Sequence, residues 1–255
     1  MEPLASSSAR PADPLMPLLD LPGVGASLAA ARAAVDRLLR HRVLRRQSAR
    51  VSAESALRGA RASAALEGSD VPLGRLRADS VEDPTVQGAL RVSSGLGELV
   101  DVWERAPLQV LARLHVLAAA GSVPADRLGR PAGDPASAAR LRGLAELVAG
   151  GSRAPGILLA AVVHGEIAAL GPFGSADGLV ARSAARLTLI TRGVDPKAVS
   201  VPEVGHLDRG DYRAALAGYG TGSEDGVARW LRHCAGAVEL GAREGLAVCE
   251  AVLRG

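Results

Sequence analysis

The sequence predicts an all-α protein, a bundle of packed helices, and three observations support this fold class. Aromatic residues make up only 2% of the 255 residues, so the core must be built from Ala, Leu and Val, which allow close helix packing. Apolar residues recur at helical spacing along most of the chain. No alternating strand pattern of any length lies between these segments, which leaves room only for a short β-hairpin or extended flap. Residues 199–204 are the best candidate for an extended piece, limited by Pro202.

The N-terminal part of the chain is expected to hold a tail and a helical region. Residues 1–22 mix Pro, Ser and Ala, and we expect them to form a disordered tail. A helical region is expected over residues 23–104, beginning with a helix at 27–46. Its apolar stripe is Leu28, Ala31, Val35, Leu38 and Leu39.

Residues 52–68 are expected to form the second helix of this region, ended by Gly68. Asp83 and Pro84 open a third helix, because Asp caps a helix and Pro is tolerated at the first position. That helix extends to about residue 104.

Residues 105–255 are expected to form the core, packed with the preceding region into one compact unit, since 48% hydrophobic content supplies a sizeable interior. A helix begins at Pro107 and ends near residue 121. Pro and Gly then interrupt residues 122–135, the longest interior loop, and loops of this length are often functional. Further helices are expected at 135–149, 154–170, 178–192, 208–217 and 223–253.

The segment 157–170 is apolar on nearly every face, which is typical of a helix in the middle of a bundle. It leads into a glycine-rich turn that begins at Gly171 and opens onto the next helix. Backbone donors and the helix dipole at such a helix start are suited to holding a phosphate. The run from Gly171 to Arg182 therefore predicts a site with nucleotide-binding ancestry.

This run and its flanks resemble the core of the Fic (Fido) family of AMP-transferring proteins, whose motif is HPFx(D/E)GNGRxxR. The matching positions are Ala160–His164, Pro172–Phe173, Gly178, Arg182 and the exit segment Gly193–Pro196. Upstream, Ser63, Glu67 and Gly68 match the family's inhibitory-helix motif, (S/T)xxxE(G/N). The resemblance covers about forty residues firmly. It implies a Fic-like helical bundle.

Departures from the family motif indicate a catalytically degenerate protein. Gly171 occupies the position of the histidine that the family uses as general base, and Ser175 occupies that of the acidic magnesium ligand. Ala176 and Asp177 replace residues of the phosphate-binding turn, and Leu179 replaces an arginine. Asp177 is expected instead to cap the helix that follows it. Relocated bases remain an alternative: His164, His206 or Glu166.

Phe173, Ser175, Asp177, Gly178 and Arg182 are therefore interpreted as the remnant of a nucleotide site, with no catalytic residue and no metal ligand. In the family, the inhibitory glutamate binds the arginine that corresponds to Arg182. We expect a salt bridge between Glu67 and Arg182 that is now structural. His164 is expected to be a hydrogen-bonded core residue.

Composition limits other functions. Thirty basic residues face 27 acidic ones, and the dense basic run at 37–50 has helical spacing without aromatic residues, so a solvated helix face is favoured. Cys234 and Cys249 lack metal-site spacing and are interpreted as small buried residues in a reducing compartment. Neither a signal peptide nor a long apolar run is visible, so a cytoplasmic protein is expected.

Three functional hypotheses follow. The first is a degenerate Fic-fold protein that acts as a binding, scaffold or regulatory module for a protein partner, with no cofactor. The second is a Fic-type nucleotidyl or phosphoryl transferase that retains ATP and Mg²⁺ through Arg182 and Arg186, which share a helix face. The third and weakest is a nucleic-acid-associated protein that uses the basic run. A redox enzyme lacks support, because no GxGxxG follows a strand.

Overall fold

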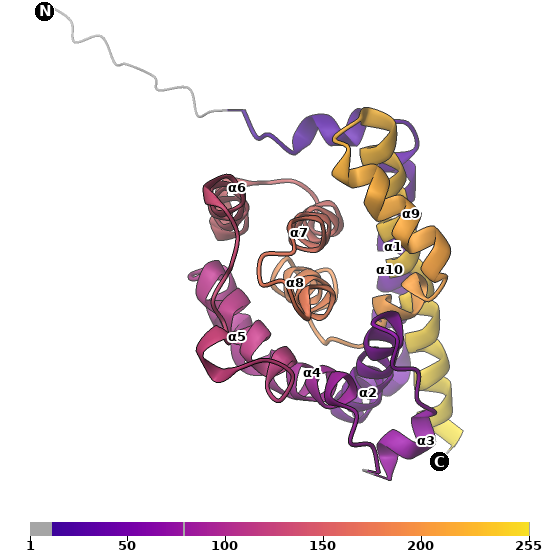
Figure 1. Cartoon of the computed structure of the whole chain (residues 1–255). Coiled ribbons are helices and arrows are strands. Elements are labelled where there is room, and N and C mark those ends of the chain that lie inside the picture. Colours follow the sequence, from indigo (N-terminus) through magenta and orange to yellow (C-terminus); the bar gives the residue numbers. More distant parts are fainter. Residues whose placement is uncertain (1–11, 79, 255) are drawn as a thin grey trace, which may run out of the picture.

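The computed structural model describes residues 12–78 and 80–254, and every regular element in this part of the chain is a helix (Figure 1). The α-helices are α1 Val24–Leu39, α2 Ser48–Leu66, α3 Leu73–Arg77, α4 Pro84–Trp103, α5 Pro107–Ala119, α6 Pro135–Glu146, α7 Gly156–Leu170, α8 Asp177–Thr191, α9 Arg209–Gly220 and α10 Glu224–Arg254. Short helical turns are η1 Met16–Asp20, η2 Arg42–Arg45, η3 Ala125–Arg127, η4 Leu147–Gly151 and η5 Pro202–His206. The all-α prediction is confirmed.

The described residues contain no β-hairpin or flap. Their only β-type pairing is an isolated bridge between Ala120 and Val123. The expected extended piece at 199–204 runs partly as the turn η5, although Val201 does pair with another element through its backbone N–H, which donates to the Gly241 carbonyl at 3.0 Å.

Helix α7 lies at the centre of the molecule beside α8, with the other helices arranged around this pair (Figure 1). Residues 157–165 of α7 are all buried, as a sequence that is apolar on nearly every face predicts. α8 packs against α7 on one side and against α2, α4 and α5 on the other. The turn between α7 and α8 is therefore supported by the two most enclosed helices of the fold.

The long helix α10 closes the bundle by packing against α1, α9 and η5. Its contact with residues 199–205 depends on glycines that let two backbones approach. A Cβ atom at Gly241 would lie 2.5 Å from the Pro202 nitrogen, and one at Gly245 would lie 2.5 Å from the Val199 carbonyl oxygen. The sequence pattern gave no sign of this close packing.

The N-terminal segment differs from the expected disordered tail. Residues 1–11 lie outside the described part of the chain, whereas residues 12–22 include the turn η1 and the buried Leu15. The Asp13 carboxylate also accepts a hydrogen bond from the Arg153 backbone N–H at 2.6 Å. The buried Leu15 and the Asp13 carboxylate thus attach residues 12–22 to the bundle.

Helix α1 ends earlier than predicted. The expected helix over 27–46 stops at Leu39, and His41 adopts an extended conformation before the separate turn η2. The His41 side chain caps η2 by accepting from the Val43 N–H. The basic run at 37–50 is therefore divided among α1, η2 and α2 rather than lying along one helix.

No helix in residues 12–78 and 80–254 combines the length and apolar character needed to cross a membrane.

Replacing Gly241 with Ala should destabilise the protein by about 1–3 kcal/mol, the usual cost of overpacking an interior contact. The matched control is Gly236→Ala on the same helix, where a Cβ atom meets nothing within 4 Å. That substitution should stabilise by about 0.5–1 kcal/mol through helix propensity. Urea denaturation of the two variants measures the difference, and equal effects would contradict the proposed backbone contact.

Candidate functional site

The turn between α7 and α8 is compact because its backbone passes through left-handed conformations. Gly171 ends α7 with φ 53° and donates its N–H to the Ile167 carbonyl at 3.0 Å. Gly174 has φ 70° and Ala176 has φ 52°. The left-handed conformation favours glycine at position 171, and this residue places no side chain in the turn.

Asp177 does not cap α8 as the sequence predicts. The helix begins at Asp177 itself, and its first turn has no side-chain cap. The carboxylate instead turns back, and its Oδ1 atom accepts the Phe173 N–H at 3.0 Å. Burial raises the pKa of Asp177, while the N–H groups of Phe173, Gly174 and Ser175 oppose that rise. The turn's donors thus face a negative group supplied by the chain.

Ser175 and Phe173 are held by His115 of α5, a residue for which the sequence indicated no role. The His115 ring stacks on Phe173 with centroids 4.3 Å apart and planes 6° apart. Its Nδ1 atom accepts the Gly129 N–H at 2.9 Å, so the neutral ring donates from Nε2 to the Ser175 hydroxyl at 3.1 Å. Burial lowers the pKa of His115, which favours this neutral form.

The long loop at residues 122–135 lies over the turn. Besides the contact of Gly129 with His115, the Ala132 N–H donates to the Pro172 carbonyl at 2.8 Å. The loop therefore covers the Pro172–Phe173 side of the turn.

The expected salt bridge between Glu67 and Arg182 is confirmed. Arg182 Nη2 lies 2.7 Å from Glu67 Oε1, and its Nε donates to the Ser63 hydroxyl at 2.7 Å. The Arg182 side chain is 3% exposed, whereas that of Glu67 is 31% exposed. A Cβ atom at Gly178 would lie 2.2 Å from Glu67 Oε1, so the glycine at this position makes room for the glutamate. Gly68, with φ 109°, follows the end of α2.

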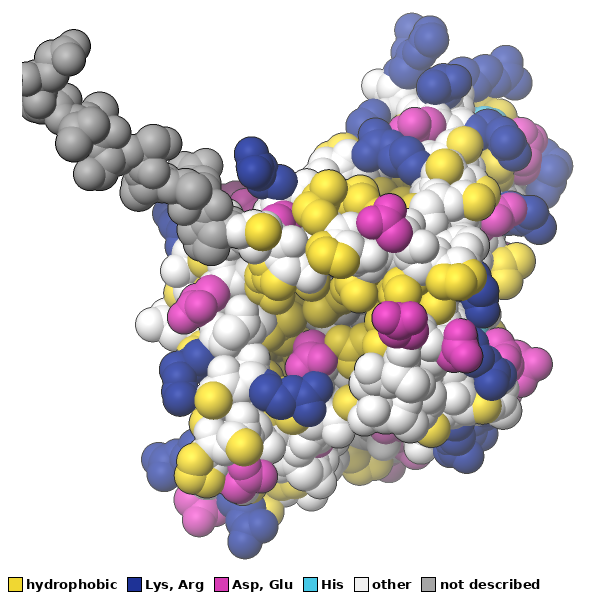
Figure 2. Space-filling model, turned by 90° about the horizontal axis from the view of Figure 1, so that it is seen from above, with side chains coloured by type: hydrophobic (Ala, Val, Ile, Leu, Met, Phe, Trp, Pro, Cys, Tyr) yellow, Lys and Arg dark blue, Asp and Glu magenta, His cyan; other side chains and the backbone are white. Residues whose placement is uncertain are grey.

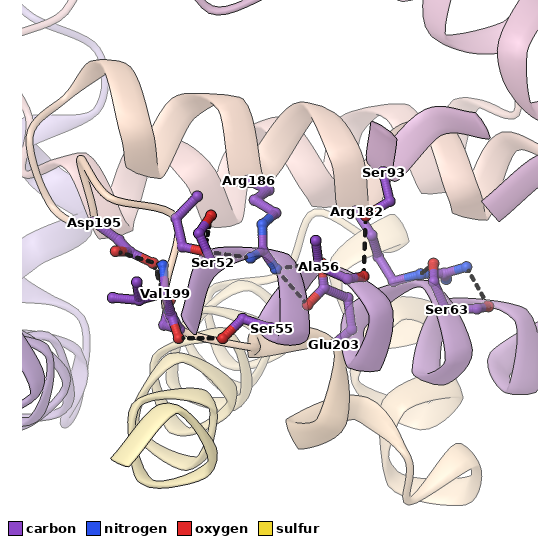
Figure 3. Close-up of polar contacts among 12 residues, drawn as sticks. Ser52, Ser55, Ala56, Ser63, Ser93, Arg182, Arg186, Asp195, Val199 and Glu203 are labelled. Carbon is purple, nitrogen blue, oxygen red and sulfur yellow. Dashed lines mark hydrogen bonds and ion pairs between the residues drawn. The ribbon is translucent and has the colours of Figure 1, made fainter. Parts of the chain in front are cut away.

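Arg186 is likewise paired inside the protein. Its Nη1 atom lies 3.0 Å from Glu203 Oε2, and Nη2 donates to the Ala198 carbonyl at 3.0 Å. Figure 3 shows Arg182 and Arg186 reaching from α8 towards α2 and the 195–203 segment. Both guanidinium groups that the second hypothesis assigns to a phosphorylated ligand therefore have partners from this chain.

Behind Arg182 lies a buried cluster of histidines. His164 Nε2 is 2.9 Å from the Tyr212 hydroxyl, which confirms the expectation of a hydrogen-bonded core histidine. His206 Nδ1 is 3.0 Å from His233 Nε2, and His233 Nδ1 is 3.0 Å from Asp211 Oδ2. Burial, followed by neighbouring positive groups including Arg182, holds the pKa of both His164 and His206 well below the usual range.

A cavity of ≈ 30 Å³ is bordered both by this cluster and by the two buried arginines. His164, Arg182, Arg186, Glu203 and His206 provide its polar lining. Such a volume accommodates water but not a nucleotide. His164 and His206 therefore face a space too small for the substrate that a relocated base would need.

Glu166, the third alternative base, lies in a different place. It contributes to a groove of ≈ 570 Å³ bordered by η1, α6, α7 and the end of α9. Figure 2 shows a hollowed and largely apolar area on this face of the molecule. The Glu166 carboxylate accepts from Arg140 Nη2 at 2.9 Å and from the Tyr219 hydroxyl at 2.7 Å, so it is engaged away from the turn.

Neither cysteine is suited to nucleophilic chemistry. Cys234 and Cys249 are both buried, and burial raises the pKa of each thiol. Across residues 12–78 and 80–254, no group of three or more His, Cys, Asp or Glu side chains is arranged to hold a metal ion.

Solved structures with a similar architecture identify the fold. A Fic family protein from Desulfovibrio desulfuricans G20 aligns with a TM-score of 0.70 at 20% identity, over 87% of this chain and 74% of its own. Fic-1 from C. elegans aligns with a TM-score of 0.71 at 18% identity, over 90% of this chain and 73% of its own. A variant of Fic-1 gives 0.64 at 16% identity, over 94% and 75% of the two chains. The protein has the Fic fold.

No protein-family model and no curated protein matches the sequence.

Three residues of the site were missed in the sequence: His115, Glu203 and Tyr212. Each lies on a different element from the residues it contacts, and the separation along the chain reaches 60 positions for His115 and Ser175. One signal in the sequence could have pointed to Glu203: Arg182 and Arg186 lie on a buried helix, and buried arginines need acidic partners. Glu203 provides one of them.

Arg182→Ala should lower the free energy of unfolding by about 3 kcal/mol, near the lower end for breaking a buried pair, because Glu67 remains 31% exposed. The control is Arg243→Ala, which removes an exposed ion pair with Glu239 on α10 and should cost about 0.3–0.5 kcal/mol. Chemical denaturation compares them. Similar small losses would show that the Arg182 pair is not structural.

Acid should destabilise the protein below about pH 6.5, where histidines of the unfolded chain take up protons but His164 and His206 do not. Stability is thus retained at neutral pH and lost as the pH falls. Two such histidines give a slope of up to about 2.7 kcal/mol per pH unit. Urea titrations between about pH 5.5 and 7.5 measure this slope. A flat profile would contradict the prediction.

Proposed function

We propose that this Fic-fold protein does not transfer AMP and instead acts as a binding or regulatory module for a protein partner. The observation that carries the proposal is the Asp177 carboxylate, which accepts the Phe173 N–H at 3.0 Å inside the phosphate-type turn. A nucleotide phosphate at this place would meet a negative charge, and the Phe173 N–H is already engaged by that carboxylate.

The other positions of the turn support the same proposal. Gly171 supplies no proton acceptor where the family resemblance implies a base, and the Ser175 hydroxyl is bonded to His115. The Arg182 guanidinium is already paired with Glu67. The base position therefore lacks a side chain, and the positions of the metal ligand and the phosphate clamp are both engaged by contacts within the chain.

Calorimetric titration with ATP and Mg²⁺ tests the proposal. The wild-type protein should give no binding up to about 1 mM ATP, and intact-mass measurement should show no AMP added to itself or to a protein substrate. Binding in the micromolar range together with AMP transfer would overturn the proposal and favour the transferase alternative.

The double variant Glu67→Ala/Asp177→Asn should gain weak ATP binding, because it frees Arg182 and removes the carboxylate that faces the turn. Glu239→Ala/Asp225→Asn removes equal charge from a half-buried and an exposed position on α10 and should leave ATP binding absent. If the first pair binds no better than the control, occupation by these two carboxylates is not what excludes the nucleotide.

A further inference from the structure

One corner of the molecule gathers positive charge without matching negative charge. Residues 37–50 contain no Asp or Glu, and the chain's only lysine joins them: Lys197 Nζ donates to the Leu44 carbonyl at 3.2 Å. We call this set the basic corner: Arg37, Arg40, Arg42, Arg45, Arg46, Arg50 and Lys197. All seven side chains belong to exposed residues.

The six arginines of the basic corner lie on or directly beside three successive elements, α1, η2 and α2. Arg37 and Arg40 are three positions apart near the end of α1 and thus share a helix face. Arg42 and Arg45 are three apart in the 3₁₀ turn η2, where such residues eclipse one another. Arg50 lies in the first turn of α2, which begins without a side-chain cap. The arginines of residues 37–50 therefore do not form the single solvated helix face that the sequence favoured.

The arginines of the basic corner also lack the ion pairs found elsewhere on the protein. Within residues 12–78 and 80–254, none of its six arginines has an acidic partner, whereas nearby Arg32 and Arg58 do. The carboxylate of Glu250 reaches this region, but it lies 3.1 Å from His41. No carboxylate among the described residues pairs with these arginines, so an external anion would reduce the repulsion between their charges.

We propose that the basic corner binds the phosphate backbone of duplex nucleic acid without reading its sequence. Guanidinium groups match phosphate oxygens as two-pronged donors, and the uncapped start of α2 adds a favourable dipole. No aromatic residue lies in 37–50 to stack on bases. A membrane surface fits less well, since Leu38, Val43 and Leu44 are buried and offer nothing apolar to insert.

Fluorescence anisotropy with a labelled duplex of about 20 base pairs tests this inference, which does not depend on whether the protein transfers AMP. For roughly four to six phosphate contacts, affinity should fall about 10²–10³-fold between 50 and 200 mM NaCl. The variant R42E/R45E/R46E should bind weakly, with the salt slope reduced by about 3.

The control R113E/R130E/R142E makes the same change in charge at exposed arginines that also lack acidic partners in the described residues, and it should bind like the wild type. Circular dichroism checks folding, and R37Q/R40Q provides a milder second test. Equal losses in both triple variants, or no binding at about 50 mM NaCl, would overturn the proposal. Binding to vesicles of phosphatidylserine and phosphatidylcholine without duplex binding would overturn it in favour of a membrane.

Discussion

The arrangement of this protein depends on the pairing of two arginines that its central helix pair buries. α8 lies beside the largely apolar α7, yet it carries Arg182 and Arg186. A guanidinium taken out of water costs several kcal/mol unless charge and hydrogen bonds compensate it. Glu67 and Glu203 supply that compensation from two distant segments, so α2 and the 198–203 segment must lie against α8. The packing of the N-terminal region on the core follows from this electrostatic need as much as from apolar burial.

The backbone of the turn follows the path that the Fic motif implies, whereas its side chains differ from that motif. Ala176 has φ 52°, a left-handed conformation that costs a non-glycine residue about 1–2 kcal/mol. The resemblance to the Fic motif places a glycine at this position, and the backbone still takes the path that a glycine favours. Surrounding contacts, chiefly those of Asp177 and His115, hold the turn in that path. The fold is thus retained by interactions that differ from those the motif implies.

Local patterns predicted most helices, because apolar spacing, Asp83 and the prolines act within a few residues. Local patterns were less informative where one residue changes the direction of the chain. His41 separates α1 from η2 by capping η2, and helix propensity does not predict such a cap. Asp177 was misplaced for a similar reason, since the left-handed Ala176 makes Asp177 the first helical residue and not its cap. The pair of Glu67 and Arg182 was predictable only from the family motif. His115 was not predictable, because its partners lie on the long loop and the turn.

The polar contacts at the turn form one connected network, so the residue that fits at one position depends on the residues at the others. His115 accepts from Gly129 and therefore donates to Ser175, which fixes its neutral form next to Phe173. A carboxylate at position 175 would also accept from that ring, but it would stand near Asp177, whose own burial already raises its pKa. Two carboxylates in this turn would repel each other unless a cation lay between them. Asp177 and a neutral residue at 175 are therefore mutually consistent, and the changes along the turn make sense as one rearranged network.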